Sequence, residues 1–151
     1  MPRIALDAIA ARNTTGYPAP FDAAVADRWV RRLGQPTGLT ALGASHVTLK
    51  PGAWSSQRHW HHGEDELVVM LTGEAVLIDD AGETLLRPGD CAAFPKGDRN
   101  GHHMINRGVA DCTFVAVSAG PSLGGEYPDI DMKWDEGGFT HKDGVPYPPK
   151  A

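Results

Sequence analysis

The 151-residue chain lacks the features typical of membrane, secreted or nucleic-acid-binding proteins. It has no run of about 18 apolar residues that could span a membrane. No apolar stretch follows a basic start at the N-terminus, so we expect no signal peptide. The net charge of −5 gives no reason to expect nucleic acid. The basic cluster "RWVRR", at 28–32, is interpreted as a solvated strand face. We therefore expect a cytoplasmic protein with neither a membrane nor a nucleic-acid partner.

Cysteine is also scarce, with two residues in the whole chain. Cys91 and Cys112 both lie within apolar runs, which predicts buried free thiols rather than a disulfide. The length is that of one domain, and it is sufficient for a hydrophobic core without covalent cross-links.

Glycine and proline, in contrast, are frequent, with 18 and 12 residues, and they divide the middle of the chain into short apolar segments. Such segments, rich in Val, Leu, Thr and aromatic residues and bounded by turn residues, are typical of β-strands. About eight in succession favour an all-β sandwich or barrel over an α/β sheet. A helical turn or two is conceivable only within residues 21–30. The expected strands lie within residues 39–50, 54–62, 66–72, 74–79, 83–87, 91–95, 102–106 and 111–118.

The stretch "RHWHHGEDE", at 58–66, concentrates groups that bind metals. His59 and His61 are two residues apart on an expected strand, so their side chains point to one face. Gly63 provides a turn, and Glu66 then begins the next strand beside the two histidines. Two imidazoles and a carboxylate suit zinc, iron(II), manganese or nickel.

A second pair of histidines, His102 and His103, follows a Pro-Gly turn and opens a later strand. Either one could supply a fourth ligand if a barrel brings the two places together. A single histidine on a strand is most often an ordinary core or surface residue, and we interpret His46 and His141 in that way.

The spacing of these residues resembles the two motifs of the cupin superfamily, whose fold is the double-stranded β-helix. The first motif is matched in "GAWSSQRHWHHGEDELVVMLTG", at 52–73, although the gap before the first histidine is one residue longer. The second is matched after Gly89, although the gap before its histidine is two residues longer. The four-residue step to Asn106 selects His102 over His103. By resemblance, one divalent metal, with zinc as the first expectation, would be held by His59, His61, Glu66 and His102. His62, Glu64 and Asp65 would then be turn residues that face solvent.

This resemblance implies a cupin, or jelly-roll, barrel with an extended arm and tail. We expect the N-terminal arm and first strand at 1–38, the barrel at 39–120 and a C-terminal extension at 121–151. The extension is polar and dotted with proline, and we expect it to build no core of its own and to pack on the barrel or on a partner.

Three imidazoles and one carboxylate leave an octahedral metal with two open positions for a small chelating molecule. Strand alternation predicts that residues on the same face as the ligands line the pocket. These are Ser55, Gln57, Val68, Met70, Met104 and Asn106. No second acid or base is evident. A small metalloenzyme of isomerase, lyase or dioxygenase type, resembling sugar-phosphate isomerases by analogy alone, is one hypothesis. A metal-dependent binding or sensing module without turnover is the other.

The segment "ELVVMLT", at 66–72, is apolar on both faces of its expected strand. A half-solvated strand would carry polar residues at every second position. The arm, the tail or a second copy of the chain must cover the outer face, and we expect a homodimer.

Overall fold

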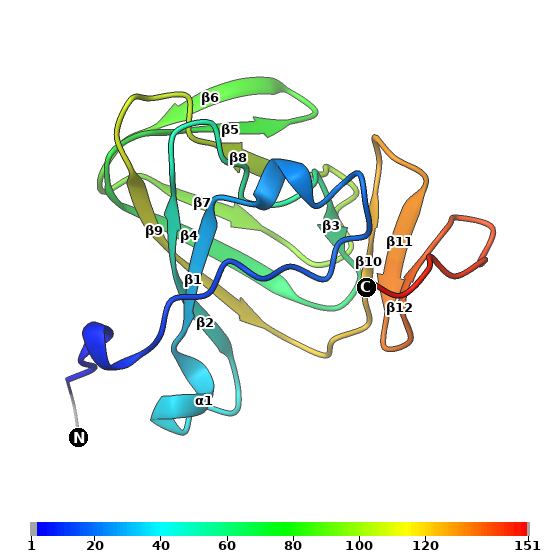
Figure 1. The fold of residues 1–151 in the computed structure, drawn as a ribbon, viewed down its shortest axis with the longest axis horizontal. Helices are drawn as coiled ribbons and strands as arrows, with labels where there is room; N and C mark the ends of the chain where they lie inside the picture. The colour runs from blue at the N-terminus through cyan, green and yellow to red at the C-terminus, as the bar shows by residue number, and fades with distance from the viewer. Residues whose placement is uncertain (1–2, 151) are drawn as a thin grey trace.

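The computed structural model describes residues 3–150, which form an almost entirely β structure (Figure 1). Three short helical segments are present: η1 Leu6–Ala8, η2 Ala23–Val25 and α1 Gly34–Thr37. The strands of the first half are β1 Arg28–Arg32, β2 Gly43–Leu49, β3 Trp60–His61, β4 Asp65–Thr72, β5 Ala75–Asp79 and β6 Gly82–Leu86. Those of the second half are β7 Cys91–Phe94, β8 His103–Ile105, β9 Cys112–Ala119, β10 Gly125–Tyr127, β11 Met132–Asp135 and β12 Gly138–Thr140.

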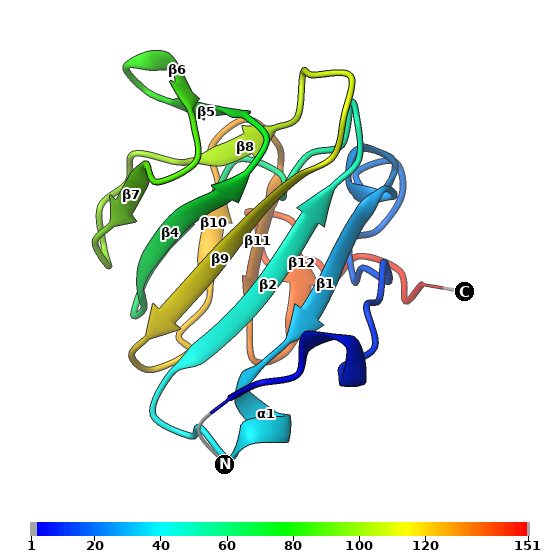
Figure 2. The same cartoon turned by 90° about the vertical axis from the view of Figure 1, so that its left-hand side faces the viewer.

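The strands form three antiparallel sheets with the orders β1-β2-β9-β4-β7, β12-β11-β10-β3 and β6-β5-β8. Figure 2 shows the five-stranded sheet as one broad layer, with β10 to β12 lying behind it. Non-consecutive neighbours, such as β2 beside β9 and β4 beside β9, produce the wound topology of a double-stranded β-helix. The all-β prediction is confirmed, and each of the eight expected apolar segments contains a strand.

Alternation along β4 defines the inner and outer faces of the large sheet. Val68 and Met70 are 2% and 1% exposed and belong to the main core, whereas Leu67 and Leu71 are 42% and 41% exposed. The N-terminal arm pairs with β1 through Arg12, and the tail pairs with β3 through β10. Within residues 3–150, neither segment buries Leu67 or Leu71.

The chain after Gly120 forms the meander β10 to β12, which the sequence analysis does not anticipate. Tyr127 and Met132 from this meander pack with Tyr17 of the N-terminal arm and Val25 in a second buried cluster. The tail therefore builds a core together with the arm. Gly125 is required here because a Cβ atom at this position would lie 2.2 Å from the Trp134 ring.

Two expectations from the sequence are wrong in part. Cys112 is buried and free, but Cys91 is exposed, because it lies on the outer face of the edge strand β7. Residues 28–32 do form a strand, but Arg28 and Arg32 face inward and line a cavity, so this face is not simply solvated.

None of the helices within residues 3–150 has the length and hydropathy needed to cross a membrane.

Candidate metal centre

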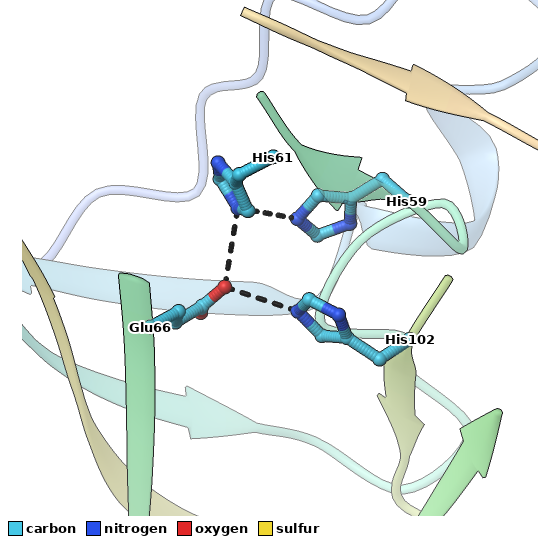
Figure 3. A group of neighbouring side chains, drawn as sticks. All are labelled: His59, His61, Glu66 and His102. Carbon is cyan, nitrogen blue, oxygen red and sulfur yellow. Dashed lines mark hydrogen bonds and ion pairs between the residues drawn. The ribbon is translucent and has the colours of Figure 1, made fainter. Parts of the chain in front are cut away.

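Four side chains from separate parts of the barrel converge on one point: His59, His61, Glu66 and His102 (Figure 3). One ligand atom from each lies within 4.8 Å of all the others. The Nε2 atoms of His59 and His61 are 3.1 Å apart. The Glu66 Oε2 atom lies 3.2 Å from His61 Nε2 and 3.0 Å from His102 Nε2. Three nitrogen atoms and one oxygen atom thus surround a common centre.

Backbone pairing sets this arrangement. The amide of His59 donates to the His102 carbonyl at 3.1 Å, and the amide of His102 donates back to the His59 carbonyl at 2.8 Å. This bridge places two histidines that are far apart in the sequence directly opposite each other. His61 follows on β3 in register with Gly125, and Glu66 lies on β4 in register with Phe94.

The spacing of the ligand atoms fits a single divalent ion. Metal–ligand bonds of about 2.1 Å separate neighbouring ligand atoms by about 3.0 Å in an octahedron and about 3.4 Å in a tetrahedron. The three closest separations here are 3.0, 3.1 and 3.2 Å. The cluster could therefore hold a metal ion, with the widest separations, which reach up to 4.8 Å, closing to the roughly 4.2 Å of opposite ligands.

The hydrogen bond made by His59 Nδ1 holds the ring in the tautomer that leaves Nε2 free to bind a metal. His59 Nδ1 lies 2.9 Å from the Gln57 carbonyl oxygen, which can only accept a hydrogen bond, so Nδ1 carries the proton. The lone pair of a neutral ring is then on Nε2, which faces the cluster. Burial and the neighbouring His102 lower the pKa of His59 to about 3, so this ring is neutral.

Glu66 is the charged partner of the cluster. Burial alone would raise its pKa, but hydrogen bonds from His102 and His61 outweigh that effect and hold the pKa well below its usual range. Burial likewise would lower the pKa of His61, but hydrogen bonding and charge from Glu66, with Glu64 adding to both, raise it. The site therefore carries a carboxylate charge that attracts cations.

The neighbouring polar residues lie apart from the centre. The buried His103 ring is 3.1 Å from the Ser56 carbonyl oxygen and stacks edge-on against Trp54. His62 is exposed beside Leu123, and Asp65 is exposed and caps the Lys96 amide. Glu64 is only partly exposed, and its carboxylate lies 3.6 Å from His61 Nδ1. Glu64 is thus closer to the cluster than the sequence suggests.

The cluster opens into a cavity of about 270 Å³. Of the six expected lining residues, Ser55, Val68 and Met104 line it. The other three, Gln57, Met70 and Asn106, do not. Gln57 donates to the Phe21 carbonyl, Met70 is packed in the core, and Asn106 is fully buried and donates to the Leu49 and Ala110 carbonyls. The parity argument does not apply to Gln57, because residues 55–58 form bends rather than a strand.

Sequence reasoning missed several residues that form the walls of this cavity. Tyr17 comes from the arm, Arg28 from β1, and Tyr127 and Trp134 from the tail meander. The Tyr127 and Trp134 rings lie 5.9 and 5.6 Å from the His59 ring between centroids. The aromatic content of the tail was the available signal, but it could not indicate what the tail covers.

An antiparallel double-stranded β-helix whose small cavity is faced by three histidines and one glutamate defines a class of barrel proteins with a candidate metal centre. The family model for a Cupin domain matches residues 45–118. A sugar phosphate isomerase of the cupin superfamily from Silicibacter pomeroyi is 44% identical, with a TM-score of 0.89 and 97% of each chain covered. The chain belongs to the cupin superfamily.

Two further relatives are more distant. The oxalate-binding protein of Thermotoga maritima is 33% identical over 73 residues, which span 48% of this chain and 58% of that protein. A polyketide cyclase from Streptomyces resistomycificus is 20% identical, with a TM-score of 0.64 over 80% of this chain and 82% of its own, and it supports the fold alone.

Proposed function

We propose that the protein is a metal-dependent cupin enzyme that acts on a small, oxygen-rich organic molecule. The observation that carries this proposal is the set of four ligand atoms, as little as 3.0 to 3.2 Å apart, facing a cavity. The relative from Silicibacter pomeroyi, called a sugar phosphate isomerase, supports isomerase chemistry ahead of lyase or dioxygenase chemistry.

In this proposal, His59, His61, Glu66 and His102 hold one divalent ion, with zinc first and manganese, iron or nickel as alternatives. When bound, the ion supplies Lewis-acid polarisation of the substrate oxygens. Neutral imidazoles and one carboxylate leave one net positive charge, which favours anionic ligands. The cavity of about 270 Å³ is slightly smaller than pockets for drug-sized molecules, which begin at about 300 Å³, so it suits one small molecule.

The residues of the chain define the rest of the chemistry. Burial raises the pKa of Tyr17 and of Tyr127, so both phenols stay protonated and could donate hydrogen bonds to a ligand. Val68, Met104 and Phe114 form apolar walls that exclude water and strengthen polar contacts with the ligand.

A binding or sensing module without turnover is the second candidate. The lining of the cavity favours this candidate, because among the described residues Glu66 is the one carboxylate that lines it. Glu66 is already assigned to the metal, so no free carboxylate is available as a general base.

The test is a panel of small hydroxy acids, keto acids and sugar phosphates, assayed after chelation and reloading with zinc, manganese, nickel or iron(II). We expect turnover to stop on chelation and to return with one of these metals. Turnover that survives full removal of metal would overturn the proposed mechanism, and tight binding without turnover would favour the sensing module.

A further inference from the structure

The guanidinium group of Arg28 lines the cavity without an acidic partner. Its Nη1 atom donates to the Ser55 carbonyl oxygen at 2.6 Å, and within residues 3–150 its side chain makes no other hydrogen bond. A guanidinium has five N–H donors, so most of its capacity is unused. Burial lowers the pKa of Arg28, and no carboxylate is among the charges that act on it.

The strand that carries Arg28 aims a second cation at the same space. Arg28, Val30 and Arg32 alternate along β1 and all line the cavity. The charge of Arg32 adds to the lowering of the Arg28 pKa, so the two groups repel each other. Buried charges are normally paired, and an anion in the cavity would provide the missing partner.

Two phenol groups complete this end of the cavity. The Tyr17 and Tyr127 rings meet edge to face, with centroids 5.7 Å apart. The Tyr127 ring also lies 5.9 Å from the His59 ring between centroids. Both tyrosines line the same cavity as Arg28, so the pair lies between the guanidinium and the metal cluster.

A short chain of contacts connects Arg28 to the metal cluster. The Ser55 residue that accepts from Arg28 has its hydroxyl oxygen 3.5 Å from that of Ser56. The Ser56 hydroxyl in turn lies 3.1 Å from His59 Nδ1. Arg28 and the four candidate metal ligands also line one cavity of about 270 Å³, so one small molecule could contact both ends.

We propose that Arg28, with the hydroxyl groups of Tyr17 and Tyr127, binds a second anionic group of the ligand, whose other end chelates the metal. This inference rests on the proposed function and deepens it by naming the ligand class. The ligand is a small chelating acid with an additional carboxylate or phosphate group. A guanidinium can bind either group through two parallel hydrogen bonds.

Matched probes test the proposal by calorimetry on the zinc-loaded protein. Lactate, malate and 3-phosphoglycerate share an α-hydroxy carboxylate that can chelate a metal. Malate adds a carboxylate and 3-phosphoglycerate adds a phosphate. We expect one of these two to bind about 10- to 100-fold more tightly than lactate, the range for hydrogen bonds to a charged group. The preferred probe identifies the second group.

The variant Arg28→Gln should remove this preference while leaving lactate affinity within about twofold and zinc content unchanged. Arg31→Gln is the matched control, because Arg31 lies on the same strand and its Nε atom donates to the Ile9 carbonyl instead. Tyr17→Phe and Tyr127→Phe remove only hydroxyl groups and should weaken the binding of the preferred probe without changing the binding of lactate. These two variants provide the test if Arg28→Gln does not fold.

The outcomes separate the two proposals. A wild-type protein that takes up no zinc and binds none of the three probes contradicts the proposed function itself. A zinc-loaded protein that binds lactate, malate and 3-phosphoglycerate equally well overturns only the role of Arg28. A preference that survives in Arg28→Gln and in both tyrosine variants also overturns that role.

Discussion

Replacing His61 by alanine should remove most of the bound metal, whereas replacing its neighbour His62 should remove little. His61 Nε2 lies 3.1 Å from His59 Nε2 and 3.2 Å from the Glu66 carboxylate. His62 is exposed, and its ring is 3.3 Å from the Leu123 carbonyl oxygen. The two histidines are adjacent in sequence but point to opposite sides of the strand.

The size of the effect follows from the number of ligands. Four-ligand zinc sites bind with about 10–16 kcal/mol, which is about 2.5–4 kcal/mol per ligand. His61→Ala should therefore weaken zinc binding by roughly 60- to 700-fold, since about 1.4 kcal/mol corresponds to a factor of ten. His62→Ala removes no ligand atom and should leave affinity within about threefold.

The assay is competition with a chromophoric chelator, supported by elemental analysis of the purified variants. Circular dichroism should show that both variants keep the β structure of the wild type. Equal losses of affinity in the two variants would refute the reasoning, because they would show that strand alternation does not select the ligands.

Three more outcomes are expected. As the pH is lowered, metal affinity should fall by about tenfold per pH unit for each proton that competes with the metal. The fall should begin above the ordinary histidine pKa of about 6.5, because the pKa of His61 is raised, and activity should be largely lost below about pH 6. Glu64→Gln should move this fall to lower pH, and a metal affinity that stays constant from about pH 5 to 8 would contradict the prediction. Light scattering should give twice the 16.1 kDa of one chain, and Leu67→Lys on the exposed outer face of β4 should give the monomer, whereas a monomeric wild type would exclude the dimer. Arg58→Ala removes the bidentate ion pair with Asp129. It should lower the free energy of unfolding by about 1 kcal/mol and Tm by about 2–4 °C. An unchanged Tm would show that the pair contributes nothing to stability.

Turn spacing was sufficient to predict an all-β sandwich or barrel, and strand parity placed His59 and His61 on one face beside Glu66. The double-stranded β-helix and the complete set of four ligands came from the resemblance to the cupin motifs. The step of two residues from His59 to His61 is local: His59 forms an isolated bridge immediately before β3, and His61 lies on β3. The choice of His102 over His103 needed the cupin motif, because parity alone cannot say which of two adjacent residues faces inward. The antiparallel bridge between His59 and His102 supplies that information in three dimensions.

The walls of the cavity could not be predicted in the same way. In "RWVRR", both faces of the strand carry one apolar and at least one basic residue, so alternation gives no preferred inner face. The pairing of Arg28 with the buried Leu49 on β2 determines which face of β1 points inward. The same ambiguity affects "CAAF", where small apolar residues occupy both faces and Cys91 takes the outer one. Tyr17 and Trp134 depend on contacts between segments far apart in the sequence.

The candidate metal ligands and the residues proposed to bind the second group of the ligand occupy different stretches of the chain. His59, His61, Glu66 and His102 lie within the cupin match at 45–118. Tyr17, Arg28, Tyr127 and Trp134 line the same cavity from outside that match. If the proposal for Arg28 holds, substitutions in the flanks should change which molecule binds without altering the candidate metal ligands. Exchanging the flanks between two cupins with the same central motifs should then change ligand preference and leave metal binding unchanged.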